Sequence, residues 1–538
     1  MSLQFIFGNS GSGKSHYLYQ QIVEESIRHP EKNYLVLVPE QFTMQTQKDL
    51  CMAHPRGGIM NIDVLSFGRL AHRVFEETGK ERQPILDDEG KNLVLRKIAG
   101  NYEDELTVLK GNLKKQGYIS EVKSVISEFT QYGIDFEQLD SFMEGLNPKS
   151  YLYYKLKDIR KVYEGFEDYL RDKYITKEEL LDVLSQNVAE AKMLKDSVIA
   201  MDGFTGFTPV QNRLIGELLK VCDKIMLTVE IDRREDPFVY KHPYQLFALS
   251  KQMVTSLTEV AQEVKVEIDE PVWLCKNPPY RFKENPEMAF LEEELFRYSR
   301  RKYSGEKMQS ISLHEVHTPQ EEAQYVAEEI RRLVREEGYR YREIAVIASD
   351  LNTYADSLEK ACERYEIPVF MDHKKSILLN SFVEYLRSLL VMVEQNYTYE
   401  SVFRYLRTGL CGFTRDEVDR LENYCLALDL KGFKKWDQVW VRKTPMTKKE
   451  ELEELNQLRV RFVEKLTPLH TVLKKRRKTV KEITLAVYEY LVQEKIQEQL
   501  AELEQKFQEE GELALAKEYA QIYRIVLELF DKFVELLG

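Results

Sequence analysis

The sequence predicts an α/β protein with P-loop, RecA-like parallel-sheet cores and large helical insertions. Three observations lead to this fold class. A glycine-rich loop follows an apolar run near the N-terminus, further continuous apolar runs recur along the chain, and the apolar period becomes helical over long stretches between them. Continuous apolar runs are typical of strands buried on both faces of a parallel sheet, and helices join such strands.

The glycine-rich loop fits the pattern G-x-x-x-x-G-K-[S/T] between a strand and an amphipathic helix, which is the context that the pattern requires. Backbone N–H groups in such a loop curl round a polyphosphate, and the next helix adds the positive end of its dipole. We expect Lys14 to reach the phosphates of ATP and the Ser15 hydroxyl to bind Mg²⁺. The alternative is an anion-binding turn without a nucleotide. The candidate nucleotide-binding residues of the loop are Gly8, Asn9, Ser10, Gly11, Ser12, Gly13, Lys14 and Ser15.

The first sheet continues after the loop. Apolar runs at 34–39 and 62–65 predict strands, and a helix is expected to begin near Ser66. From about 85 to 195, apolar residues recur at i, i+3, i+4 or i+7, which predicts an all-helical insertion.

The sheet is expected to resume with strands at 197–204 and 224–229, separated by a helix over 211–219. Prolines then interrupt the pattern between about 233 and 305, so a domain boundary is expected there.

A second α/β unit is predicted from three apolar runs at 311–316, 343–348 and 367–370, which would be its strands. Helices are expected over 319–336, 351–365 and 382–393, and the sequence is helical and highly charged from about 395. The predicted domains are a first core (1–85 and 196–300), its helical insertion (86–195), the start of a second core (306–394) and a second helical insertion (395–538).

Composition narrows the class of protein. The chain has 538 residues, enough for several domains, and a net charge of −13, which argues against indiscriminate binding to polyanions but permits a local basic groove. No long apolar run predicts a membrane span and no leader precedes the first strand, so we expect a cytoplasmic protein without membrane contact. The six cysteines form no C-x-x-C pair, and most are expected to be core thiols.

The order of elements resembles a UvrD-like (superfamily 1) helicase. The family's second acidic motif usually reads D-E-F-Q-D-x-x-P-x-Q, and residues 202–211 keep its spacing. Its matching residues here are Asp202, Phe204, Pro209 and Gln211. We expect Asp202 to act on Mg²⁺ through an intervening group, the alternative being a strand-end aspartate that caps the following turn.

The departures from this family remove catalytic groups. Gly203 replaces the glutamate that orients the attacking water, Thr205 replaces a glutamine, and 348–350 lack the arginine that reaches the γ-phosphate. The segment that recognises adenine has no room before Phe5. Since arginine fingers contribute about 10³- to 10⁵-fold in rate, the resemblance implies ATP binding with negligible hydrolysis. The alternatives are an active ATP-dependent translocase and, from another class, a small-molecule P-loop kinase.

Four segments together resemble the AddB/RexB family, the helicase-like subunits of bacterial AddAB helicase–nucleases: 8–15, 38–43, 66–71 and 202–211. The resemblance implies an AddA-type partner, contact with single-stranded and duplex DNA, and reading of the Chi sequence during recombinational repair of double-strand breaks. Family members continue into a nuclease domain with Mg²⁺ and an iron–sulfur cluster. We expect neither that magnesium nor the cluster in this chain, which is interpreted as an N-terminal portion.

The same resemblance suggests which residues face single-stranded DNA. Segments after the second and third strands and one neighbouring loop supply polar, basic and aromatic side chains, the groups that hold single strands. Phe67 and Phe207 could instead be core rings, and His72 stands where a larger aromatic is expected. The candidate DNA-binding residues are Gln41, Thr43, Phe67, Arg69 and Phe207.

Overall fold

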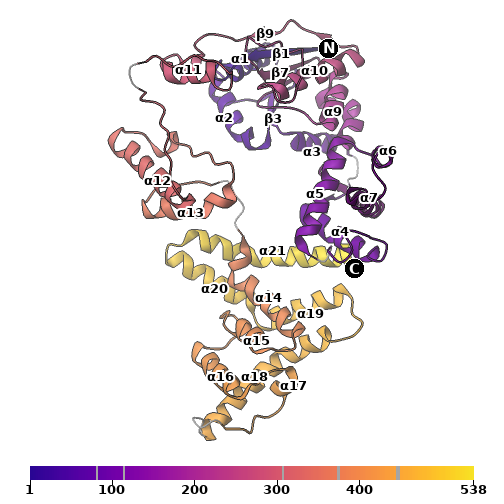
Figure 1. The fold of residues 1–538 in the computed structure, drawn as a ribbon, viewed down its shortest axis with the longest axis vertical. Coiled ribbons are helices and arrows are strands. Elements are labelled where there is room, and N and C mark those ends of the chain that lie inside the picture. Colours follow the sequence, from indigo (N-terminus) through magenta and orange to yellow (C-terminus); the bar gives the residue numbers. More distant parts are fainter. Residues whose placement is uncertain (80–82, 113–114, 306–307, 372–375, 444–448) are drawn as a thin grey trace. The chain divides into compact units, whose positions relative to one another are not determined.

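The structure, a computed structural model, describes residues 1–79, 83–112, 115–305, 308–371, 376–443 and 449–538. It divides into two compact units, Met1–Ser312 and Leu313–Gly538 (Figure 1). The predicted second core begins at 306, and residues 306 and 307 lie outside the described residues.

The first unit contains a parallel sheet with the strand order β3-β2-β6-β7-β1-β8, and β9 also pairs with β1. β1 pairs with β7 from Ser2 to Gly8 on one side. On its other side it pairs with β8 and then β9. The strands are β1 (Ser2–Gly8), β2 (Tyr34–Leu37), β3 (Ile62–Leu65), β6 (Val198–Met201), β7 (Lys224–Glu230), β8 (Glu267–Ile268) and β9 (Val272–Trp273).

Helices cover both faces of this sheet because its strands are apolar on both sides. Along β1, Phe5 and Phe7 enter one core and Ile6 enters the other. The Ile6 core contains residues of α1 and α2. The Phe5 core contains residues of α3, α8, α9 and α10. These helices are α1 (Lys14–Arg28), α2 (Thr43–Ala53), α3 (Phe67–Thr78), α8 (Leu180–Asn187), α9 (Pro209–Leu219) and α10 (Ala248–Glu263).

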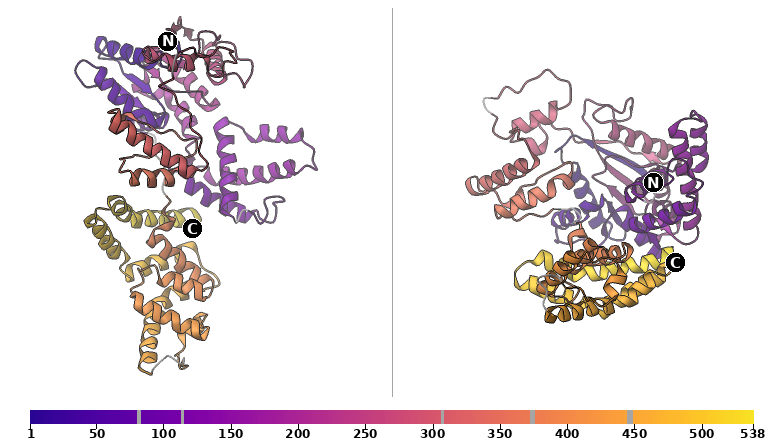
Figure 2. Two further views of the ribbon diagram at one scale, coloured as in Figure 1. Left: turned by 60° about the vertical axis from the view of Figure 1, so that its left-hand side comes forward. Right: turned by 60° about the horizontal axis from the view of Figure 1, so that its bottom comes forward.

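A helical insertion interrupts the sheet between β3 and β6, and its helices project from the sheet (purple in Figure 2). The short strands β4 (Ile85–Leu86) and β5 (Ile175–Thr176) pair at its base. Inside it, the buried Asp158 carboxylate accepts hydrogen bonds from the backbone N–H groups of residues 107–109, which fixes that loop on α7. The inserted helices are α4 (Asp88–Asn101), α5 (Gln116–Tyr132), α6 (Phe136–Glu144) and α7 (Tyr151–Leu170).

The predicted strands of the first sheet and the helix beginning after Ser66 are confirmed, and the Ser66 hydroxyl caps α3 by accepting from the Arg69 N–H. The proline-interrupted stretch also contains α10, α11 (Pro286–Glu294), β8 and β9, none of which the sequence pattern predicted. For the two strands the reason is length, because two-residue strands carry no detectable period.

The second unit opens with α12 (Pro319–Glu336) and α13 (Leu351–Arg364), and the bounds of both helices agree with the predicted bounds to within one residue. The predicted strands at 311–316, 343–348 and 367–370 are wrong, since none of these segments is a strand in the part of the chain that the structure describes. They lack ladder partners, and a parallel strand is stable only between neighbours. Several of their apolar side chains are consequently exposed, as at Leu313, Ile347 and Phe370, although Ile367 is buried against α12 and α13.

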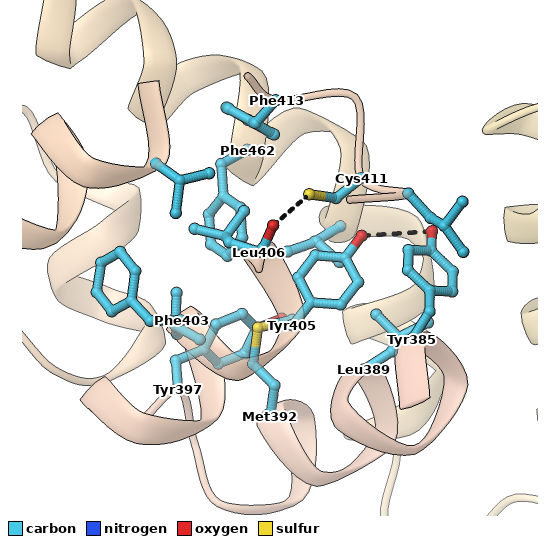
Figure 3. Close-up of a cluster of buried hydrophobic side chains, with 14 of the residues drawn as sticks. Tyr385, Leu389, Met392, Tyr397, Phe403, Tyr405, Leu406, Cys411, Phe413 and Phe462 are labelled. Carbon is cyan, nitrogen blue, oxygen red and sulfur yellow. Dashed lines mark hydrogen bonds between the residues drawn. The ribbon is translucent and has the colours of Figure 1, made fainter. Parts of the chain in front are cut away.

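The rest of the second unit is helical, as predicted, with one continuous core running from Phe382 to Val526. Inside it the hydroxyls of Tyr405 and Tyr490 lie 2.6 Å apart, and Tyr405 also donates to Tyr385 (Figure 3). The helices are α14 (Ser381–Glu394), α15 (Tyr399–Leu406), α16 (Arg415–Leu428), α17 (Phe433–Asp437), α18 (Lys449–Leu473), α19 (Val480–Gln493), α20 (Ile496–Glu509) and α21 (Leu513–Leu537).

Four of the six cysteines are buried thiols, Cys222, Cys362, Cys411 and Cys425, which confirms that most are core residues. Cys411 donates to the Leu406 carbonyl oxygen inside the helical core (Figure 3).

We expect Phe462→Ala to lower the free energy of unfolding of the helical core by about 3–5 kcal/mol, because this buried ring would leave a cavity. Urea unfolding followed by the fluorescence of Trp436 and Trp440 measures the change. Val460→Ala, on the same helix but 38% exposed, is the control and should change it by less than about 1 kcal/mol. Equal effects of the two substitutions would contradict the assigned core.

Candidate nucleotide and DNA site

The loop between β1 and α1 is closed by its own backbone and by Lys14. The Ser12 N–H donates to the Asn9 carbonyl oxygen at 3.2 Å, and the Lys14 ammonium donates to the same oxygen at 2.9 Å. Gly11 and Gly13 have φ of 72° and 94°, where an L side chain is strained. At Gly8 a Cβ would lie 2.4 Å from the Ser12 hydroxyl oxygen. The glycines are therefore required by the path of the loop.

The loop has the groups that a polyphosphate needs. Burial lowers the pKa of the Lys14 ammonium, and the carboxylates of Glu230 and Asp202 partly offset this effect. The Ser12 hydroxyl oxygen is buried and has no hydrogen-bond partner among the described residues. A phosphate in the loop would accept from both groups and would compensate the buried positive charge. The residues present thus fit a nucleoside triphosphate.

Asp202 follows β6 at the carboxyl edge of the sheet and is only 7% exposed. Both of its oxygens accept hydrogen bonds, one from the Tyr19 hydroxyl at 2.8 Å and the other from the Thr228 hydroxyl at 2.5 Å. Burial raises the pKa of the Tyr19 hydroxyl, and the Asp202 carboxylate beside it raises that pKa further. Ser15 is exposed in the first turn of α1. Asp202 is thus held between α1 and β7, and an indirect role on Mg²⁺ remains a prediction.

Three residues near the loop were not found by sequence reasoning. Glu230 ends β7 directly opposite Gly8. The Arg281 N–H donates to the Gly11 carbonyl oxygen at 3.0 Å, so the short helix η4 (Tyr280–Phe282) lies on the loop. Glu292, on α11 (Pro286–Glu294), accepts from the Asn9 side-chain amide at 3.0 Å, and burial raises its pKa. No motif marks these residues, because only long-range pairing brings them to the loop.

The candidate DNA-binding residues lie after β2, β3 and β6, at the same edge of the sheet. Gln41 and Arg69 are exposed, and Thr43 is buried with its hydroxyl on the Glu40 carbonyl oxygen. Phe67 is 8% exposed and packs 5.5 Å from the Phe204 ring and 6.2 Å from the Phe207 ring.

The loops after β2 and β6 also meet at Phe42, which is not among the predicted site residues. Phe42, in the short helix η1 (Glu40–Phe42), is 47% exposed, and its ring lies near Gly203. Its accessible ring extends the polar surface formed by Gln41. The signal was available in the sequence, since Phe42 stands between two candidate residues.

Metal clusters and membrane spans are both absent from the described residues. No group of three or more His, Cys, Asp or Glu side chains there is arranged to hold a metal ion. Among the helices of the described chain, none combines the length and apolar character that crossing a membrane requires.

Comparison with known proteins gives two matches along the chain. The family described as "ADDB, N-terminal" matches residues 5–292, and the UvrD-like helicase C-terminal domain matches residues 283–537. Two proteins named as the B-type subunit of an ATP-dependent helicase/deoxyribonuclease are similar over all of this chain: that of Lachnoclostridium phytofermentans, at 41% identity, and that of Clostridium novyi, at 32%. The chain spans about half of these relatives, 47% and 46% of their lengths.

The parallel sheet, the phosphate-type loop and the second match define a P-loop α/β protein that carries a UvrD-like helicase C-terminal domain. Within this class, the chain belongs to the AddB family.

Gly203, in the loop that begins at Asp202, has a φ of 77°. We expect Gly203→Ala to cost about 1–2 kcal/mol of unfolding free energy, since an L residue is strained in this conformation. Gly206→Ala in the same loop is the control, because its φ is not positive and its Cβ would meet nothing within 4 Å. Urea unfolding compares them, and a Gly203 variant as stable as the control would contradict the strain.

Proposed function

We propose that this chain is the nucleotide-binding, helicase-like part of a helicase–nuclease subunit, and that it binds ATP and Mg²⁺ without appreciable hydrolysis. The observation that carries the proposal is a complete phosphate loop at the same edge of the sheet as Gly203, which has no side chain to orient an attacking water. Lys14 and Ser12 would hold the phosphates, and Ser15 the metal. The bound nucleotide would then stabilise the loop and its neighbours rather than drive movement.

The proposal extends to DNA. The loops after β2, β3 and β6 would hold single-stranded DNA and read the Chi sequence as it passes. Exposed Gln41 and Arg69 supply polar and basic contacts, and Phe207 supplies a ring. The names of the relatives describe one subunit of a helicase and deoxyribonuclease. By analogy this chain would act with an AddA-type motor in the cytoplasm, in the repair of double-strand breaks by homologous recombination.

One observation favours a second candidate, an active ATP-dependent translocase. Glu230 and Arg281 both lie close enough to the Lys14 ammonium to affect its pKa, which Glu230 raises and Arg281 lowers. A carboxylate and a guanidinium from these positions could orient water and stabilise the γ-phosphate. These are the two roles of the glutamate and the arginine that the sequence motifs of this chain lack. Lys14 donates to the Asn9 carbonyl oxygen, so this hydrogen bond does not engage the Glu230 carboxylate.

We expect Lys14→Ala to weaken ATP binding by about 1.5–3 kcal/mol, since it removes charge-assisted hydrogen bonds to the phosphates. Calorimetry with Mg²⁺–ATP measures the loss, and Lys32→Ala, a lysine paired with Asp223 outside the loop, is the control.

An ATPase assay of the unaltered chain and its Lys14→Ala variant distinguishes the two candidate functions. ATP turnover stimulated by single-stranded DNA should be negligible in the unaltered chain. Turnover of several per second, abolished by both Lys14→Ala and Glu230→Gln, would establish the translocase and refute the first candidate.

The loops after β2, β3 and β6 are here called the proposed single-strand channel. We expect Arg69→Ala to weaken binding of a single-stranded oligonucleotide by about 1–3 kcal/mol, since an exposed basic side chain of this channel would be lost. Fluorescence anisotropy at fixed salt measures it. Arg73→Ala, on the same helix but paired with Asp63, is the matched control. Unchanged affinity of the Arg69 variant, with its fold intact, would remove the channel from this edge of the sheet.

A further inference from the structure

A cleft of about 560 Å³ opens in the first unit beside the phosphate loop. It lies at the carboxyl edge of the sheet, where ligands bind in open α/β sheets. Its walls come from the segment after β7 and from the end of β9. The residues that line the cleft include Arg233, Glu235, Asp236, Phe238, Trp273 and Cys275.

The cleft adjoins the first residue of the loop. Trp273 is in register with Phe7 on β1, and the Leu274 N–H donates to the Phe7 carbonyl oxygen at 2.8 Å. One residue further on, Cys275 lies near the loop, because the Asn9 backbone and Lys14 both lower the pKa of its thiol against the larger effect of burial, which raises it. A ligand with its phosphates on Lys14 can therefore extend into the cleft.

Two aromatic rings stand in the walls with their inner sides anchored. Trp273 packs at 4.8 Å on Phe7, and Phe238 lies edge-on to the rings of Phe7 and Phe5 at 5.9 Å and 6.2 Å. Even so, Trp273 is 40% exposed and Phe238 is 41% exposed. Rings held from behind and open in front are suited to stacking on a planar ligand, because little conformational freedom is lost on binding.

The polar groups of the cleft differ in how far they are already engaged. Glu235 pairs with Lys251 at 2.5 Å, and one oxygen of Asp236 accepts from the Phe238 N–H at 3.0 Å. Arg233 is exposed and makes no hydrogen bond or ion pair with any residue that the structure describes. The cleft thus offers a guanidinium and the second oxygen of a carboxylate.

The cleft and Asp202 lie on opposite sides of β1, as the two ends of one bound nucleotide would require. Asp202, on the magnesium side, lies beyond β7, whereas β9 lies on the opposite side of β1. A nucleotide bound in the loop therefore has its metal side towards β7 and room for its base towards β9.

We propose that this cleft binds the purine base of the nucleoside triphosphate whose phosphates occupy the loop, an inference that rests on the proposed function. Trp273 and Phe238 stack on the base. Asp236 accepts from a ring amine, and Arg233 contacts the ribose or the α-phosphate. A purine is favoured over a pyrimidine because it offers the larger stacking surface.

The test compares a complete nucleotide with its phosphates alone. In the full chain, Trp273 is the partly exposed tryptophan, whereas Trp436 and Trp440 are buried in the other unit. Mg²⁺–ATP should quench the tryptophan fluorescence and Mg²⁺–tripolyphosphate should not. By calorimetry, Trp273→Ala and Phe238→Ala should each weaken ATP and GTP about tenfold or more, the loss of one stacking contact, and leave tripolyphosphate unchanged. Trp273→Phe should restore most of the affinity.

The controls separate this inference from the proposed function. Tyr244→Ala removes an 80% exposed ring that does not line the cleft and should change nothing. Lys14→Ala should weaken ATP and tripolyphosphate alike, and its failure to do so would refute nucleotide binding in the loop. ATP binding that depends on Lys14 but is unaffected by Trp273→Ala and Phe238→Ala, without quenching, would overturn the cleft as the base site.

Discussion

The pairing of β1 with β7 on one side and with β8 and β9 on the other is the constraint on which the first unit depends. Seven residues of β1 are in register with β7, which sets Gly8 opposite Glu230. The two short strands then hold 267–275 against the other side of β1. Because all these strands are parallel, every loop that could touch a nucleotide emerges at one edge. The phosphate loop, Asp202 and the cleft share this origin.

Charge in this unit is distributed so that the loop is ready for an anion. Lys14 is partly buried and holds a backbone oxygen, while Asp202 is already satisfied by two hydroxyls. An engaged carboxylate does not compete with a phosphate for the lysine. The same arrangement leaves Lys14 available to a phosphate without first breaking an ion pair to Asp202.

The two units contrast in how they bury apolar surface. The helical part of the second unit forms a continuous core with buried, hydrogen-bonded tyrosines such as Tyr405. In contrast, residues 313–371 expose Leu313, Ile347 and Phe370, which strand patterns would bury. Helices satisfy their backbone locally, whereas strands need partners, so the helical part buries a core among the described residues while the segments with a strand pattern leave apolar side chains exposed.

The sequence by itself determined the phosphate loop, the strands of the first sheet, the helical insertion and the family, because glycine spacing, continuous apolar runs and the 3.6-residue period are local properties. Gly203 was also visible as a departure from a motif. Only the tertiary structure decided that Phe67 is buried, that Asp202 is held by Tyr19 and Thr228, and that Glu230, Arg281 and the Trp273 cleft surround the loop. These facts depend on contacts between segments far apart in the sequence, such as the pairing of Gly8 on β1 with Glu230 on β7, which no local pattern records.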